Sequence, residues 1–298
     1  MRALAVLAAV ACWSCGADFD RSIAVLSANT ILAVRAEPPE SLPGADVTYT
    51  ALAATAAGAD AKAEVVWSFC ATAPAATEDA PVSASCIAGE SPGIASGTVV
   101  TLATPADACR RFGPLGVPTP AGAAPAQPAP PDATGGFFAP LRLGWQDRVS
   151  MVRERLTCDP TGVSLDLAQA YRAARTPNRN PQLLPLVAMV ADQPADLGAL
   201  PPLAVVDLVA AWSPESVESY VTVDGERAIL DWHSEKLWVA WFVTGGALGS
   251  DVSQAALPET TASNRLTAPG SPGTYYLWTV LHDDRGGIDF AQTEVVVR

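Results

Sequence analysis

The sequence predicts an all-β fold of two tandem β-sandwich domains. Three observations predict it: 26 prolines and 22 glycines are scattered along 298 residues, short apolar runs alternate with polar residues, and Asp224-Gly225 separates two such runs. Frequent turn formers favour short strands over long helices. Alternation is typical of strands that bury one face, and Asp-Gly is a strong hairpin signal.

The first domain is expected over residues 28–176. Alternating or apolar runs predict its strands at residues 30–35, 47–53, 65–70, 97–102, 137–143 and 148–158. Apolar residues recur at helical spacing over 164–174, so one short helix is expected near the domain junction. Residues 113–136 hold seven prolines and one charged residue. This composition cannot build a packed element, and we expect a disordered insertion there.

The second domain is expected over residues 183–298, after a stiff, turn-rich junction at 175–181. Its strands are predicted at residues 203–212, 220–223, 227–232, 236–244, 274–282 and 288–297. The run 236–244 is apolar on both faces, which predicts a central strand. A buried tryptophan on a central strand, among six or seven short antiparallel strands, is typical of an immunoglobulin-like sandwich.

Residues 1–15 have the features of an export signal. Arg2 precedes an apolar run, Ala3–Ala11, which is shorter than the ~20 residues that span a bilayer. A cysteine after such a run resembles the lipobox of bacterial lipoproteins, with Cys15 as the expected lipidation site and Cys12 as the alternative. Plain secretion with cleavage near Ala17 stays open. Residues 16–27 are then expected to form a tether.

The lipobox resemblance implies an outer-membrane lipoprotein, because Gly16 and not an Asp follows Cys15. A formal net charge of −13 argues against nucleic acid as a partner, since phosphate binding needs clustered Lys and Arg. It also argues against electrostatic attachment to an anionic membrane. Contact with the membrane is therefore expected through the lipid anchor, and we expect the location to be the cell envelope.

Seven arginines lie close together in the sequence with acidic residues interleaved, which predicts a solvated, salt-bridged face. They are Arg142, Arg148, Arg153, Arg155, Arg172, Arg175 and Arg179.

Four cysteines remain after the predicted signal: Cys70, Cys86, Cys109 and Cys158. In an exported protein they predict two disulfides, for which three connectivities are open. We favour the pairs Cys70–Cys86 and Cys109–Cys158, of which the second would close the loop that holds the predicted insertion. The spacing of these four fits no zinc site, since no two of them form a Cys-x-x-Cys pair and the chain has two histidines.

Four segments resemble uncharacterised surface lipoproteins that are common in myxobacteria. They are Ile31–Pro39, the Trp67–Cys70 strand, the Asn178–Pro181 junction and the closing Leu277–Gly287 hairpin. The resemblance covers most of the chain after the signal. It implies immunoglobulin-like folds and a location in the envelope, and it implies no activity.

Few side chains are candidates for chemistry. The carboxylates Asp283, Asp284 and Asp289 gather at a predicted hairpin, where they are weak calcium candidates, although solvated turn residues are the favoured interpretation. Trp232, Trp238, Trp241 and Trp278 could line a carbohydrate platform, but their alternating neighbours favour a sandwich core. No cofactor motif occurs, and we expect neither a cofactor nor catalytic residues.

These features predict a non-enzymatic lipoprotein of the cell envelope that acts as a structural or binding module for a protein or a glycan. One alternative is an envelope hydrolase with a site at the domain junction that uses His233 or His282. Another is an accessory subunit of an outer-membrane complex.

Overall fold

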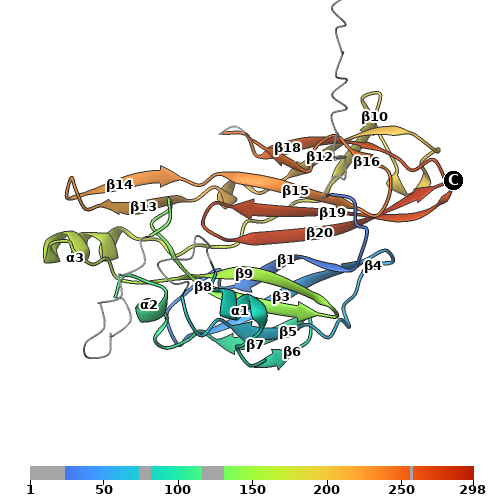
Figure 1. Ribbon diagram of the computed structural model, residues 1–298. Helices are drawn as coiled ribbons and strands as arrows, with labels where there is room; N and C mark the ends of the chain where they lie inside the picture. The colour runs from blue at the N-terminus through green and yellow to red at the C-terminus, as the bar shows by residue number, and fades with distance from the viewer. Residues whose placement is uncertain (1–23, 74–81, 116–130, 256–257) are drawn as a thin grey trace, which may run out of the picture.

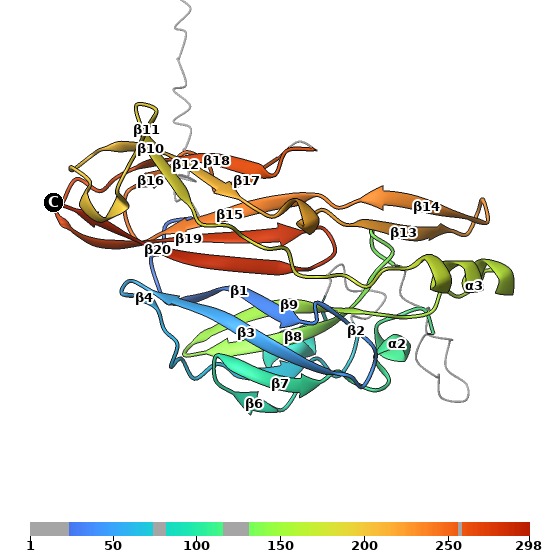
Figure 2. The same ribbon diagram turned by 180° about the vertical axis from the view of Figure 1, so that it is seen from behind.

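The computed structural model describes residues 24–73, 82–115, 131–255 and 258–298. These residues form two β-sandwiches that lie face to face, so that four β-layers are stacked (Figures 1 and 2). The strands of the first sandwich lie between residues 30 and 156, and those of the second lie between residues 187 and 297. Residues 157–186, which include a helix, connect the two.

The first sandwich consists of two sheets whose edges do not pair. One sheet contains β1 (Thr30–Glu37), β3 (Asp46–Thr55), β4 (Gly58–Ala59) and β7 (Val99–Ala103). The other has the order β2 (Glu40–Ser41), β9 (Arg148–Leu156), β8 (Phe137–Trp145), β5 (Val66–Phe69) and β6 (Ala95–Ser96). Pairing is antiparallel apart from β2, which lies parallel to β9.

The second sandwich is built in the same way. One sheet has the order β11 (Gln193–Pro194), β10 (Val187–Val190), β12 (Val205–Ala211), β18 (Thr261–Thr267) and β16 (Ala247–Leu248). The other has the order β17 (Val252–Gln254), β15 (Leu237–Val243), β19 (Gly273–Asp283) and β20 (Ile288–Val297). A separate hairpin of β13 (Ser219–Asp224) and β14 (Ile229–Ser234) extends from one end.

Both sandwiches share one strand order. Setting aside the hairpin and the short strands β2, β4, β11 and β16, and counting the two-residue strand β6, each has seven strands. The first, second and fifth form one sheet, and the fourth, third, sixth and seventh form the other. This is the order of an immunoglobulin-like sandwich, and the predicted fold class is confirmed.

A fully buried tryptophan lies on the third strand of each sandwich, as that fold leads one to expect. Trp67 on β5 donates its indole N–H to the carbonyl of Gly97 at 2.8 Å. Trp241 on β15 donates to Ser253 Oγ at 2.7 Å. Each ring therefore packs in the core with its polar atom satisfied.

The predicted helix is α3 (Leu165–Ala174), which begins at Ser164 because that side chain accepts a hydrogen bond from Leu167 N at 3.2 Å. The remaining helical segments are short: α1 (Ala84–Ala88), α2 (Ala108–Arg111), η1 (Leu197–Ala199) and η2 (Pro214–Ser216). Within the described parts of the chain, no helix is long and apolar enough to cross a bilayer.

Two disulfides close one end of the first sandwich. Cys70, after β5, is bonded to Cys86 on α1, and Cys109 on α2 is bonded to Cys158, after β9. These are the two pairs that the sequence favours. They lie in a small apolar cluster with Phe112 and other side chains, separate from the main core, so they fix α1 and α2 to the sheet.

The two sandwiches meet through apolar side chains. Ala33 on β1 and Leu52 and Ala54 on β3 pack against Trp278 and Val280 on β19. Each of these side chains lies on the outer face of its own sandwich, and each is buried by the other sandwich. The pair is therefore a stack and not an end-to-end chain of domains.

Three expectations need correction. Residues 132–136, the end of the expected disordered insertion, are ordered, because Asp132 Oδ1 accepts hydrogen bonds from Thr134 N and Gly136 N at 2.9 and 3.1 Å. Residues 116–130 lie outside the described chain. The hairpin turn spans four residues and not two, since Asp224 pairs with Ile229. The end of the expected tether, Ala24–Ser27, packs on the second sandwich, as described below.

Candidate functional site

Glu40, on the short strand β2, is a buried carboxylate where the two sandwiches meet. Its Oε1 accepts a hydrogen bond from Arg175 Nη2 at 2.9 Å, and its Oε2 accepts one from the backbone N of Asn178 at 2.8 Å. Arg155 and Arg285 each place a nitrogen 3.6 Å from Oε2. Burial acts to raise the pKa of Glu40, but Arg155 and Arg175 outweigh it and the pKa is lowered. Glu40 is therefore held ionised.

Arg285 connects Glu40 to the second sandwich. It lies in the turn between β19 and β20 and is 1% exposed. Its Nε lies 3.2 Å from Glu235 Oε1, and its Nη2 donates to the carbonyl of Thr176 at 3.2 Å. Its guanidinium also lies 5.2 Å from the centre of the Tyr220 ring. One side chain thus contacts the first sandwich, the connecting segment and the base of the hairpin.

Glu235 is fully buried between β14 and β15. Its Oε2 accepts a hydrogen bond from the backbone N of Glu218 at 3.1 Å. Burial, and after it the negative charge of neighbouring Asp283, raise the pKa of Glu235 to about 8. A proton therefore resides on Glu235 at neutral pH, in a site where a second buried negative charge would be costly.

The connecting segment is held on both sides. Asn178 donates through Nδ2 to Asp283 Oδ2 at 3.3 Å. Arg179 forms an ion pair with Glu218. Asn180 donates to the carbonyl of Ala36 at 2.6 Å and accepts from the backbone N of Ile288 at 2.9 Å. The segment that the sequence identifies as a stiff junction is thus bonded to both sandwiches. We call Glu40, Arg155, Arg175, Asn178, Glu235, Asp283 and Arg285 the ionic junction.

The predicted solvated arginine face is wrong for part of the cluster. Arg155 is buried and donates to Thr134 Oγ1 at 2.7 Å, and Arg175 is half-buried against Glu40. Arg172 does lie in an exposed ion pair, with Asp159 at 2.8 Å. The buried partner, Glu40, is far away in the sequence, so a local charge pattern does not reveal it.

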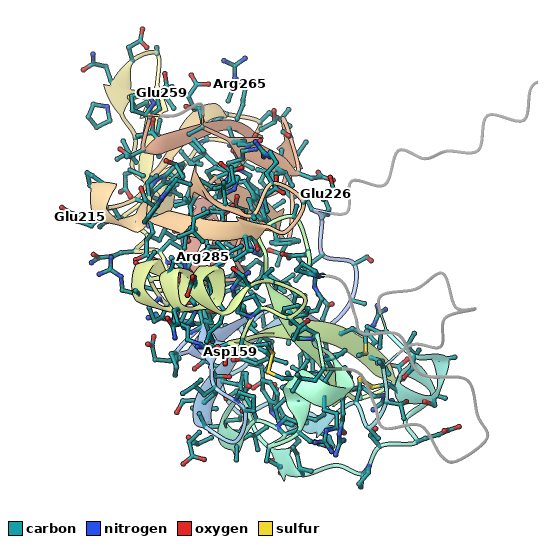
Figure 3. All side chains as sticks on the ribbon, turned by 90° about the vertical axis from the view of Figure 1, so that its left-hand side faces the viewer. Asp159, Glu215, Glu226, Glu259, Arg265 and Arg285 are labelled. Atoms are coloured by element: carbon teal, nitrogen blue, oxygen red, sulfur yellow. A yellow bond between two sulfur atoms is a disulfide. The ribbon has the colours of Figure 1, made fainter. Side chains whose placement is uncertain are left out.

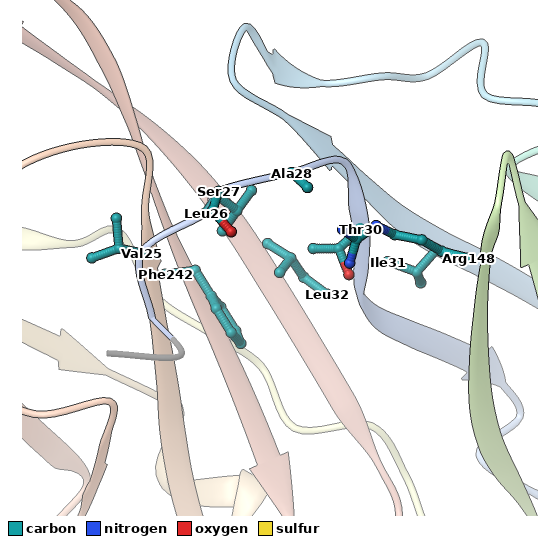
Figure 4. A pocket seen from close by; sticks show the side chains of 9 residues that line it. All are labelled: Val25, Leu26, Ser27, Ala28, Thr30, Ile31, Leu32, Arg148 and Phe242. Carbon is teal, nitrogen blue, oxygen red and sulfur yellow. The ribbon is translucent and has the colours of Figure 1, made fainter. Parts of the chain in front are cut away.

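The chain enters the described structure against the second sandwich. Val25 forms a parallel bridge with Val243 at the end of β15, where Leu26 N donates to the carbonyl of Val243 at 2.9 Å and Val243 N donates to that of Ala24 at 2.8 Å. Residues 25–28 and 30–32 then line a crevice of about 260 Å³ together with Phe242 and Arg148 (Figure 4). This segment joins the second sandwich to β1 of the first.

The hairpin β13–β14 and helix α3 form a projection that we call the arm. β14 continues into β15 with only Glu235 and Lys236 between them, so the arm tip at Ile229 and the entry bridge at Val243 lie at opposite ends of one run. At roughly 3.3 Å per residue the two ends are up to about 46 Å apart. Figures 1 and 2 show the arm projecting from one end of the body, with the first described residues away from it.

The arm has an inner and an outer face. Register places Tyr220, Thr222 and His233 together on one face, where Arg285 covers Tyr220 and Gly135 of the first sandwich lies against Thr222. This inner face is covered by α3, which lies between the hairpin and the first sandwich (Figure 3). The outer face carries six side chains: Ser219, Val221, Val223, Leu230, Trp232 and Ser234.

The two histidines have different surroundings. His282, on β19, stacks on Trp238 with ring centres 5.3 Å apart, and burial lowers its pKa to about 4. His233, on β14, lies 3.0 Å from Thr222 Oγ1 and 3.6 Å from Asp231. The two rings belong to separate clusters, so the structure does not join them in one site.

The three calcium candidates also serve separate contacts. Asp283 accepts backbone N–H groups from Arg285 and Gly287 at 2.8 and 2.7 Å, which fixes the β19–β20 turn. Asp289 pairs with Arg35 at 3.3 Å. Burial raises the pKa of Asp284, which lies beside Lys236. Among the residues that the structure describes, no group of three or more acidic, histidine or cysteine side chains could hold a metal ion.

The four tryptophans do not form one platform. Trp241 and Trp278 are fully buried, and Trp238 is half-buried against His282. Trp232 differs, because it is 60% exposed on the outer face of the arm. The lipidation candidates Cys15 and Cys12 lie outside the described residues.

The chain matches no protein-family model and no curated protein. Solved structures with some likeness include the D00-D0 domain of Intimin, at 7% identity and a TM-score of 0.26 over 91% of this chain and 98% of that one. The D0-D1 domain of Intimin follows at 10% identity and a TM-score of 0.24, covering 89% and 98%. The Yersinia pseudotuberculosis adhesin InvE has 9% identity and a TM-score of 0.24, over 89% of this chain and 58% of that one. These likenesses assign no function to the chain.

Proposed function

We propose that this protein is a non-enzymatic module of the bacterial cell envelope that presents the arm to a protein or glycan. In this proposal a lipid on Cys15 holds the N-terminus at the outer membrane, as the lipobox resemblance and the likeness to myxobacterial surface lipoproteins suggest. Two or more acyl chains anchor a protein stably in a membrane, whereas a single acyl chain anchors it only marginally. The two disulfides agree with an oxidising compartment outside the cytosol.

The observation that carries the proposal is the contact set of Arg285. This buried side chain joins Glu40 of the first sandwich to Glu235 at the base of the arm. Arg285 and the ionised Glu40 are a buried pair of charges, and losing one partner of such a pair is strongly destabilising because a buried charge is left alone. The contacts therefore keep the arm in a fixed orientation on a stacked body, and the first described residues bridge Val243, far from the arm tip. Such geometry serves presentation at a distance from a membrane.

Attachment is tested by expressing the full chain in a Gram-negative host with radiolabelled palmitate. Wild type and Cys12→Ser should carry label and sediment with the outer membrane, whereas Cys15→Ser should lose both. Label on Cys15→Ser but not on Cys12→Ser would move the lipid to Cys12. Label on neither wild type nor variants would refute the anchored form.

Presentation is tested with a photo-crosslinking residue at Ile229 on the arm tip, and with the same residue at Val205 as control. Both side chains are about half-exposed, at 43% and 50%, and Val205 lies on a different sheet. Adducts in the native envelope should form from position 229 and not from position 205. Equal labelling from both sites would contradict the proposal, as would a hydrolase activity that His233→Ala or His282→Ala abolishes.

A further inference from the structure

The outer face of the arm carries no charged side chain, although the protein has a net charge of −13. Its six positions are serine, valine, leucine and tryptophan. The charges of the hairpin lie elsewhere, since Asp231 shares the inner face with His233, and Arg227 in the turn pairs with Asp224. A charged partner would find nothing of opposite sign on this face. Charge matching therefore points to an uncharged occupant.

Trp232 is the main feature of this face. It is 60% exposed, whereas Trp67, Trp212, Trp241 and Trp278 are at most 1% exposed. Val221 lies directly opposite it and is buried, and Leu230 and Val223 form the next pair toward the tip. The indole thus lies at the centre of a flat, apolar strip on a ribbon whose other face is fixed to the body. Large exposed aromatic rings on rigid elements mark binding surfaces.

Two hydroxyl groups lie next to the ring, both on the side toward the base of the arm. Ser219 and Ser234 are directly paired on the same face, on the base side of Val221 and Trp232. Both are exposed, and neither hydroxyl has a hydrogen-bond partner within the described chain. Each can donate and accept. An aromatic plane beside free hydroxyls matches a pyranose ring, which has an apolar C–H face and hydroxyls at its rim.

We infer that the outer face of the arm binds a neutral glycan, with Trp232 stacking on a sugar ring and Ser219 and Ser234 bonding to its hydroxyls. This inference rests on the proposed function and names the class of ligand. A peptide that adds to an edge of the hairpin would use backbone groups and would not require Trp232. A second copy of the chain would make the protein dimerise.

The test uses the mature full-length protein and three neutral hexasaccharides, built of glucose, mannose and N-acetylglucosamine, with hexagalacturonate as the acidic probe. Wild type should bind at least one neutral probe in isothermal titration, with a change in tryptophan fluorescence, and bind the acidic probe at least tenfold more weakly. Trp232→Ala should weaken binding by about tenfold or more. Ser234→Asp, which adds a charge to the face, should do the same.

Leu165→Ala is the matched control, because Leu165 is 68% exposed and apolar but lies on α3, away from the outer face. It should bind as wild type does, and circular dichroism should show all variants folded. The inference is overturned if no neutral probe binds, if Trp232→Ala binds equally well, or if the acidic probe is preferred. Dimerisation that Trp232→Ala abolishes would also overturn it, in favour of a second copy.

The two proposals fail separately. Crosslinks from position 229 to an envelope protein, with no glycan bound, would leave the presentation of the arm intact and remove the glycan. Glycan binding by wild type without any membrane attachment would support the glycan site and contradict the anchored form of the proposed function.

Discussion

The first sandwich carries both disulfides and a buried carboxylic acid in its interior, whereas the second has no cysteine and a larger apolar core. Glu154, on β9, is 2% exposed near Tyr49 and Ser41. The second core instead contains Trp212, Trp241 and many leucines. One strand order is thus stabilised in two ways.

The difference follows from the loops. In the first sandwich α1 and α2 lie outside the main core, and the disulfides attach them to the sheet. A cross-link acts mainly by restricting the unfolded chain. In the second sandwich a larger cluster of apolar side chains is buried, which stabilises the fold without a cross-link. The same topology is therefore stabilised by disulfides in one sandwich and by a larger apolar core in the other. Each kind of stabilisation can be removed separately by mutation.

The largest expected effect comes from removing the disulfide that closes the longer loop. The double variant Cys109→Ala/Cys158→Ala, with a separation of 49 residues, should lower the free energy of unfolding of the first sandwich by about 4 kcal/mol. The pair Cys70–Cys86 spans 16 residues and should be worth about 3 kcal/mol. Hydrogen exchange with mass spectrometry should show the loss in β8 and β9. An equal loss in β15 and β19 would show that the sandwiches unfold as one unit.

Truncating a core side chain should lower the free energy of unfolding of the second sandwich, as removing a disulfide should for the first. Leu208→Ala on β12 removes a fully buried side chain and should cost about 3 kcal/mol in denaturant unfolding. Val205→Ala on the same strand is the control, because Val205 is 50% exposed and should change stability by less than about 0.5 kcal/mol. If both variants behave alike, packing is not what stabilises this sandwich.

The buried acid should make the first sandwich sensitive to pH. Burial raises the pKa of Glu154 to about 8, while the unfolded value is about 4.3. Between these values the folded state holds a proton that the unfolded state has lost, so stability falls as pH rises from about 4.3 to about 8 and is flat above. Glu154→Gln should therefore be more stable than wild type at pH 9 and similar to it near pH 4.

Thermal unfolding from pH 4 to pH 9 measures this dependence. Glu235 also has a pKa raised to about 8, so the single variant should flatten only part of the profile. Glu154→Gln/Glu235→Gln should flatten more of it. A profile that Glu154→Gln leaves unchanged would mean that Glu154 is ionised in the folded protein.

The smallest effect concerns α3, which belongs to neither sandwich but packs on the arm. Ser164→Ala removes the N-cap acceptor for Leu167 N and should cost about 1 kcal/mol. Ser164→Asn keeps an acceptor and should restore most of this loss. Hydrogen exchange over 165–174 provides the measurement, and protection equal to wild type in Ser164→Ala would refute the role of the cap.

The elements that could be predicted from the sequence are those whose residue pattern is local. Alternation identified β15 and the long strands β19 and β20, and helical spacing identified α3. The four cysteines indicated two disulfides in the pairs now seen. Each signal depends on residues within one element, or on a small number of reactive side chains, so a pattern suffices.

Three features could not be predicted from the sequence and are seen in the fold: how the sandwiches stack, which arginines are buried and which tryptophan faces solvent. Arg155 looks like a surface charge in sequence and is buried because Glu40 and Thr134 meet it from other elements. Trp232 and Trp241 occupy similar alternating runs, yet only Trp241 lies under a second sheet. A buried charge or a covered ring depends on partners that the fold brings from elsewhere in the chain, and local pattern carries no record of them.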